Sequence, residues 1–142
     1  MIKKAGKKIV LVGGCFDLLH YGHYIFLKKA KKQGDYLIVA VESDQSIIKH
    51  KKRKPIHSQK QRAEILTELK CVDQVILLPY LSSDSEYKSF VKKIHPDIIA
   101  VTQGDPQIEN KRKQAAQVGG RLEIVTPVLG DFSTQKIIQA LL

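Results

Sequence analysis

Two histidines in the first quarter of the sequence have the spacing and the neighbours of an anion-binding turn. His20 and His23 lie three residues apart around Gly22, and the pair Gly13–Gly14 precedes them. Glycines let backbone N–H groups approach a ligand closely, the start of a helix offers free N–H donors, and imidazoles can donate to phosphate oxygens. We therefore expect this segment to bind an anionic group. A single histidine would more often be structural, and a zinc site would need three or four ligands.

The elements around this segment indicate how it is positioned. Short apolar, β-rich runs alternate with segments of helical spacing along the whole chain. Strands are predicted at residues 8–12, 36–41, 75–78, 98–101 and 121–125. Helices are predicted at about 22–33, from Ser58, at 83–94, at 107–117 and from Ser133 to the end, with capping boxes at Ser58 and Ser83. This alternation predicts an α/β fold: a Rossmann-like doubly wound five-stranded parallel sheet in a single domain of residues 1–142.

Ligands of such sheets bind outside the carboxyl ends of the strands. The loops expected at that edge are 13–23, 42–57, 102–106 and 126–134. The second of them overlaps an unusually basic segment. The net charge is +10, and the segment 49–62 has seven Lys and Arg residues and no acid.

A charge of this size indicates a polyanionic partner, which can be nucleic acid, a membrane surface or a small phosphate compound. The basic segment has no Phe, Tyr or Trp side chain on which bases could stack. A small polyanion is therefore favoured. A non-catalytic nucleic-acid-binding domain on the same fold is the alternative from another class.

The first loop resembles the signature of the cytidylyltransferase-like nucleotidyltransferases. The residues at the signature positions are Gly14, Phe16, Asp17, His20, Gly22 and His23. The run Phe-Asp-Leu-Leu-His is similar to the branch of glycerol-3-phosphate cytidylyltransferases and heptose-phosphate adenylyltransferases, and the resemblance extends to Ser133–Thr134. It implies that a phosphate oxygen of an acceptor attacks the α-phosphorus of ATP or CTP and that pyrophosphate leaves. Mg²⁺ would bridge triphosphate oxygens without direct side-chain ligands.

The resemblance also implies roles for particular residues. The catalytic residues would be His20 and His23, together with one or two of Lys49, Lys51 and Lys52 from a mobile loop. The nucleotide-binding residues would be Gly14, Cys15, Phe16, Asp17, Gly22, Arg62, Gly104, Asp105, Ser133 and Thr134.

Several of these residues also have a purely structural interpretation. Asp17 can either order the turn, which is structural, or hold a ligand or metal. Arg62 can form a surface salt bridge, and Ser133 can be a simple N-cap. Cys15 stands where many relatives have threonine, so contact with a ligand there would be made by the backbone.

The substrates are left partly open by the sequence. Val128 stands where the cytidylyltransferase pattern has an arginine, and the heptose-phosphate adenylyltransferases lack that arginine too, which favours ATP over CTP. The acceptor implied is a sugar or polyol phosphate such as heptose 1-phosphate or glycerol 3-phosphate. FMN, the acceptor of similar FAD synthases, is the alternative. Members of this family are commonly dimers.

The cellular setting follows from what the sequence contains. Its two cysteines, Cys15 and Cys71, form no Cys-x-x-Cys pattern, and no apolar run approaches the roughly 20 residues of a membrane span. The apolar stretch behind the basic N-terminus is too short for a signal-peptide core. We expect a cytoplasmic enzyme without a membrane partner.

Overall fold

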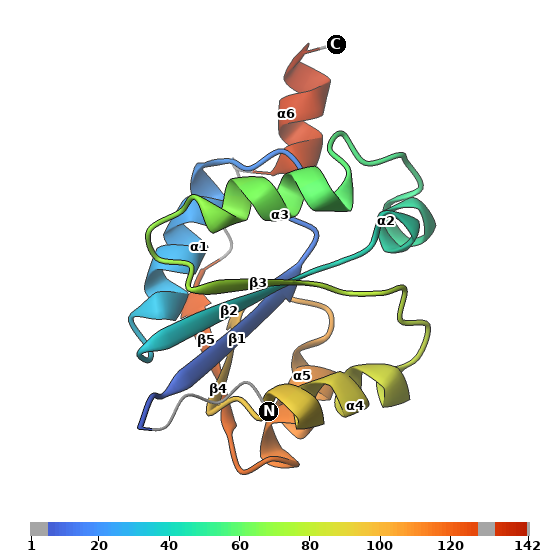
Figure 1. Cartoon of the computed structure of the whole chain (residues 1–142). Helices are drawn as coiled ribbons and strands as arrows, with labels where there is room; N and C mark the ends of the chain where they lie inside the picture. The colour runs from blue at the N-terminus through green and yellow to red at the C-terminus, as the bar shows by residue number, and fades with distance from the viewer. Residues whose placement is uncertain (1–5, 128–132, 142) are drawn as a thin grey trace.

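Five parallel strands form one sheet. The computed structural model describes residues 6–127 and 133–141, and the strands in it run in the order β3-β2-β1-β4-β5 (Figure 1). They are β1 (Ile9–Gly14), β2 (Tyr36–Val41), β3 (Gln74–Leu77), β4 (Ile98–Thr102) and β5 (Arg121–Thr126). All pairings are parallel, and β1 and β2 align Ile9 with Tyr36 through Gly14 with Val41. The predicted fold class is confirmed.

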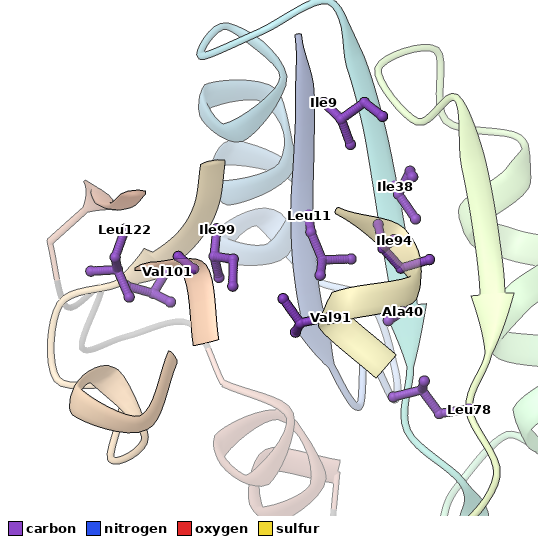
Figure 2. Packing of buried hydrophobic residues seen from close by; sticks show 11 residues of the cluster. Ile9, Leu11, Ile38, Ala40, Leu78, Val91, Ile94, Ile99, Val101 and Leu122 are labelled. Carbon is purple, nitrogen blue, oxygen red and sulfur yellow. The ribbon is translucent and has the colours of Figure 1, made fainter. Parts of the chain in front are cut away.

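Helices cover both faces of this sheet. The described helices are α1 (Tyr21–Lys31), α2 (Asp44–Lys51), α3 (Gln59–Thr67), α4 (Asp84–Ile94), α5 (Ile108–Ala116) and α6 (Thr134–Leu141). On one face Leu27 of α1 and Leu66 of α3 are fully buried against the sheet. On the other, Val91 and Ile94 of α4 pack on the opposite side chains of the same strands (Figure 2). None of the described helices is long and apolar enough to cross a membrane.

The segment expected as a loop at 42–57 contains a helix, which corrects the sequence-based prediction of five helices. The described residues form six helices, and the additional one is α2. It begins after Ser43, whose side chain accepts from the Ser46 N–H, and it ends at Lys52, which has a φ of 55°. The signal was weak because only Ile47 of this short helix is a buried hydrophobic residue. The expected mobile loop is thus half helix, and Figure 1 shows α2 beyond the end of β2.

The order of the strands determines where a site can form. From β1 the chain proceeds to β2 and β3 on one side, whereas β4 and β5 lie on the other. Between β1 and β4 the order reverses, and ligands of such sheets bind outside the carboxyl ends of the strands at that point. The segment 15–23, which follows β1, includes the first turn of α1 and contains both histidines, lies there and is called the histidine loop.

Candidate active site

His20 and His23 together cap the start of α1. His20 is the N-cap residue, and its Nδ1 accepts from the Gly22 N–H at 3.1 Å. His23 is the third residue of the helix, and its Nδ1 accepts from the His20 N–H at 3.3 Å. Two N–H groups at the helix start are thereby satisfied by imidazoles in place of the usual Ser and Glu side chains.

This capping assigns the protonation of both rings. A nitrogen that accepts a hydrogen bond carries no proton, so each neutral ring has its proton on Nε2. Burial lowers the pKa of His20, and burial together with the nearby His20 lowers the pKa of His23 to about 4. Near pH 7 both side chains are therefore neutral and offer an Nε2–H donor.

The loop between β1 and α1 supports these rings through Phe16. The Phe16 ring is 5% exposed and meets His23 edge-on, with centroids 5.4 Å apart. A Cβ on Gly14 would lie 3.0 Å from the Phe16 ring, so a side chain at position 14 would displace it. Phe16 and Leu18 have φ of 50° and 57°, values that are uncommon outside glycine. Phe16 thus contributes packing beneath a histidine.

Asp17 connects the histidine loop to the basic segment. Its carboxylate is 2% exposed and accepts from Arg53 Nη1 at 2.9 Å and from the N–H groups of Ile56 and His57 at 2.8 and 3.0 Å. Burial would raise the pKa of Asp17, but these hydrogen bonds outweigh burial and hold the pKa below its ordinary value. Of the two interpretations of Asp17, these contacts are those of an ordering residue.

Arg62 is an interior residue, so its interpretation as a surface salt bridge is wrong. The residue is 1% exposed, and its guanidinium donates to the carbonyl oxygens of Cys15, Glu42 and His57 at 2.8, 2.8 and 3.1 Å. It also forms an ion pair with Asp44 at 2.6 Å. Arg62 therefore joins the ends of β1 and β2 to the start of α3, and the described contacts give it a positioning role.

The three candidate lysines differ in their surroundings. Lys49 lies over the ring of Tyr80, 5.7 Å from its centroid. Lys51, the last residue of α2, lies near the loop after β1, because its charge acts on the Cys15 thiol. Burial nevertheless raises the pKa of Cys15, so the thiol is protonated near pH 7. Lys52 is exposed and terminates the helix. Lys51 and Lys52 are both exposed, and of the three lysines Lys51 is the one whose charge acts on Cys15.

The loops after β4 and β5 contain the remaining candidates. Gly104 has φ 87°, which favours glycine. Asp105 accepts from the Gln107 N–H at 2.7 Å and pairs with Lys111 at 2.6 Å. Ser133 caps α6 by accepting from the Lys136 N–H at 3.1 Å. The side chain of Thr134 and the departure from the family pattern at Val128 lie outside what the structure describes.

The model of the cytidylyltransferase-like family matches residues 11–137. This range includes both histidines, the basic segment and Ser133. The chain belongs to the cytidylyltransferase-like family. The resemblance inferred from the first loop is thereby confirmed, as is the expectation, at the level of this family, that the chain is a nucleotidyltransferase.

Several known proteins are similar to this chain over long stretches. The bifunctional protein HldE of Citrifermentans bemidjiense is 39% identical over 140 residues, which are 96% of this chain and 28% of HldE. The FAD synthase of Thermococcus kodakarensis is 43% identical over 113 residues, or 80% of this chain and 72% of that protein. A lipopolysaccharide core biosynthesis protein from Thermoplasma volcanium has a TM-score of 0.69 at 30% identity and covers 87% of this chain and 97% of its own.

The chain therefore spans little more than a quarter of HldE, and the names of the two relatives differ in what they say. One name refers to FAD, whereas the other refers to a bifunctional protein.

The described residues do not form a preformed metal-binding site. Within residues 6–127 and 133–141, no three His, Cys, Asp or Glu side chains converge. The Asp17 carboxylate is occupied by three donors, and Glu42 accepts from Tyr87. These described residues therefore do not fit a Mg²⁺ ion held by several carboxylates.

Reasoning from the sequence missed two contacts, that of Arg53 with Asp17 and that of Tyr87 with Glu42. Arg53 was counted among the basic charges, but its contact with Asp17 joins positions 36 residues apart. Glu42 and Tyr87 form a hydrogen bond over 45 residues. No spacing signal in the sequence marks such pairs, because the folded sheet alone brings them together.

Proposed function

We propose that this chain transfers AMP from ATP to the phosphate group of a small sugar or polyol phosphate. An acceptor phosphate oxygen bonds to the α-phosphorus, the bond from that phosphorus to the oxygen bridging to the β-phosphate breaks, and pyrophosphate leaves with that oxygen. The observation that carries the proposal is the pair of neutral imidazoles on the first turn of α1, each with Nε2–H as its remaining donor.

The mechanism relies on position and electrostatics, since no protein nucleophile is needed. Negative charge spreads over the α-phosphate oxygens as the new bond forms, and preorganised N–H donors stabilise it most when they need not reorient. The capping hydrogen bonds hold His20 and His23 in this way. Lys51 adds a positive charge from the adjacent α2, and Asp17 and Arg62 fix the segment on which it lies.

The nucleotide is placed on the β4 and β5 side of the histidines. Gly104, Asp105, Ser133 and Thr134, which the resemblance assigns to the nucleotide, follow these two strands. ATP is preferred over CTP because the arginine of the cytidylyltransferase pattern is absent at position 128. Asp105 accepts from the Gln107 N–H and pairs with Lys111, and Ser133 caps α6, so contacts with a nucleotide there would be made chiefly by backbone groups.

FMN is the second candidate acceptor, and it is favoured by a specific observation. The Thermococcus kodakarensis FAD synthase is similar over 80% of this chain. FAD formation from FMN is the same reaction type, an attack by a phosphate oxygen on the α-phosphorus of ATP. FMN also has a hydroxylated chain next to its phosphate, so it shares that chemistry with a sugar phosphate.

The experiment is a matrix of substrates. ATP, CTP, GTP and UTP are each combined with glycerol 3-phosphate, heptose 1-phosphate, choline phosphate and FMN, and pyrophosphate release is measured. We expect release with ATP and one hydroxylated acceptor, and none when either substrate is omitted. Absence of acceptor-dependent release in every combination would contradict the proposed function.

A nucleic-acid-binding function is tested alongside. Of the seven basic residues in the segment 49–62, Arg62 is buried and Arg53 is paired with Asp17, which reduces the charge open to a polyanion. Binding to an oligonucleotide is measured from 50 to 200 mM salt. A steep loss of affinity together with an inactive substrate matrix would favour nucleic acid instead.

A further inference from the structure

Glu42 lies at the carboxyl end of β2 with its position fixed on both sides. Its N–H donates to the Gly14 carbonyl at 3.0 Å, and its own carbonyl accepts from Arg62 at 2.8 Å. The residue therefore lies beside the start of the histidine loop, on the opposite side of β1 from β4.

Tyr87 of α4 orients the Glu42 carboxylate. Its hydroxyl donates to Oε2 of Glu42 at 2.6 Å, and Ser46 Oγ donates to the same oxygen at 3.4 Å. No described group donates to Oε1, and none of the described side-chain nitrogens or oxygens that lack a partner is buried. Oε1 is consequently not fully buried while the other oxygen is held, so the carboxylate presents one oriented acceptor without a partner among the described residues.

The groups around Glu42 are polar and of mixed charge. The electrostatic neighbours of Cys15 include Lys51 and Glu42, and those of Tyr87 include Glu42, Cys15 and Tyr80. These side chains share one neighbourhood beyond the carboxyl ends of β1 to β3. It offers an ammonium group for a phosphate and a carboxylate for a hydroxyl group.

We propose that Oε1 of Glu42, held by Tyr87, accepts a hydrogen bond from a hydroxyl group of the phosphorylated acceptor and so selects hydroxylated acceptors. This inference rests on the proposed function, which places the nucleotide on the β4 and β5 side and leaves the β2 side to the acceptor. A carboxylate accepts strongly from hydroxyl groups. It also repels phosphate, so the acceptor phosphate would point toward Lys51 and the histidines.

The alternative acceptors differ in how well they suit this group. A sugar phosphate, glycerol 3-phosphate and the ribityl chain of FMN all have hydroxyl groups near a phosphate. A site that pairs a buried or oriented polar group with a substrate hydroxyl discriminates strongly against an analogue without it, because the protein group is left unpaired. Glu42 is thus a specificity-determining residue, and Tyr87 is a positioning residue that acts through it.

The test compares Glu42→Gln with wild type on two acceptors that differ in hydroxyl groups, glycerol 3-phosphate and n-propyl phosphate, and repeats the comparison with heptose 1-phosphate and FMN. For the hydroxylated acceptor that the enzyme uses, we expect KM to rise about 10- to 100-fold, with KM for ATP and kcat within about twofold. Discrimination against n-propyl phosphate should shrink correspondingly. Equal losses on hydroxylated and deoxy acceptors, or a change in KM for ATP, would overturn the assignment.

Two further variants separate specificity from structure. Tyr87→Phe should raise acceptor KM by less than Glu42→Gln, and the double variant should be no worse than Glu42→Gln alone, because both act through one carboxylate. Additive losses would overturn the pairing. The matched control is Glu86→Gln, since Glu86 is on the same helix and also accepts from hydroxyl groups, those of Ser82 and Ser83. It should leave acceptor KM unchanged.

Equilibrium binding of the acceptor tests the role of Glu42 separately from the proposed reaction. Glycerol 3-phosphate, heptose 1-phosphate and FMN are titrated calorimetrically into wild type and Glu42→Gln saturated with a non-hydrolysable ATP analogue. Weaker binding to Glu42→Gln supports the assignment even if turnover is absent. Equal affinity of the two proteins, or no binding to wild type, overturns it, whereas inactivity of wild type in the substrate matrix counts against the proposed function alone.

Discussion

The imidazole rings of His20 and His23 stack with their centroids 3.8 Å apart and their planes inclined by 23°. Two neutral rings tolerate this contact, whereas two imidazolium ions at this separation would repel each other. The stack therefore agrees with the lowered pKa of both side chains. It also agrees with the use of each Nδ1 as a capping acceptor. Capping and phosphate binding are thus divided between the two nitrogens of each ring.

Replacing either histidine by asparagine should separate these two tasks. The asparagine Oδ1 can still accept from the helix N–H, but the distal N–H donor is lost. For His20→Asn and His23→Asn we expect turnover to fall about 100- to 1,000-fold, as when one oxyanion-hole donor is removed. The free energy of unfolding in urea should change by less than about 1 kcal/mol.

The control for this pair is His95→Asn. His95 is exposed and ends α4 with φ 55°, a conformation that asparagine tolerates. This variant should keep wild-type turnover. Wild-type pyrophosphate release in both loop variants would contradict the assignment of His20 and His23.

The lowered pKa of His23 predicts a loss of stability in acid. The unfolded chain has an ordinary histidine near 6.5 and the folded chain one near 4, so between these values the unfolded state binds more protons. Stability is therefore full above about pH 6.5 and falls as the pH decreases toward 4. A proton on Nδ1 would also break the bond from the His20 N–H.

Urea denaturation at pH 7.5 and pH 5.0 measures this effect. Wild type should lose stability between the two pH values, and His23→Asn should lose less, because the titrating ring is gone. The pKa of Asp17 is lowered from an ordinary value of 3.8, so its contribution lies at a more acidic pH. An equal loss in His23→Asn and wild type would assign the acid sensitivity to other groups.

The sequence was informative wherever local spacing determines the structure. His20 and His23 are three residues apart, and both bonds of the histidine cap lie within this turn. Ser58 and Gln61 likewise form the expected capping box. The unbroken apolar run at 36–41 forms the buried strand β2, as expected for a strand covered on both faces.

Other features differ from what local spacing predicts. Ser83 caps α4 as expected, but Glu86 accepts from the Ser82 N–H, so the second box is only half formed. Nothing near Arg62 in the sequence indicates burial, because its acceptors Cys15 and Glu42 are 47 and 20 residues away. An arginine in an amphipathic helix is ordinarily exposed. Its interior position follows from the meeting of three segments at the sheet edge.

Arg62→Met should destabilise the fold strongly while removing no surface charge. The carbonyl oxygens of Cys15, Glu42 and His57 would lose their donor inside the protein. Breaking a buried, hydrogen-bonded charge in this way costs about 3–5 kcal/mol. Chemical denaturation measures the change, and Arg62→Lys should recover only part of it, since one ammonium group cannot replace the guanidinium fork.

Lys60→Met on the same helix is the control for Arg62. Lys60 is exposed, and its substitution should change the free energy of unfolding by less than about 0.5 kcal/mol. If Arg62→Met and Lys60→Met were equally stable, the buried network around Arg62 would contribute little to the fold.

Among the basic residues of α2 and its end, Lys51 should matter most for the triphosphate. Its charge acts on Cys15 in the loop after β1, whereas Lys49 lies over the Tyr80 ring and Lys52, exposed like Lys51, terminates the helix. Lys51→Gln should lower kcat/KM for the triphosphate about 10- to 100-fold, the loss of one charge-assisted hydrogen bond. It should also weaken the dependence of kcat/KM on salt, because salt screens such an attraction. Lys49→Gln and Lys52→Gln are the matched controls, and their kcat/KM for the triphosphate should stay within about threefold of wild type. A larger loss of kcat/KM in either control than in Lys51→Gln would assign the phosphate contact to that residue instead.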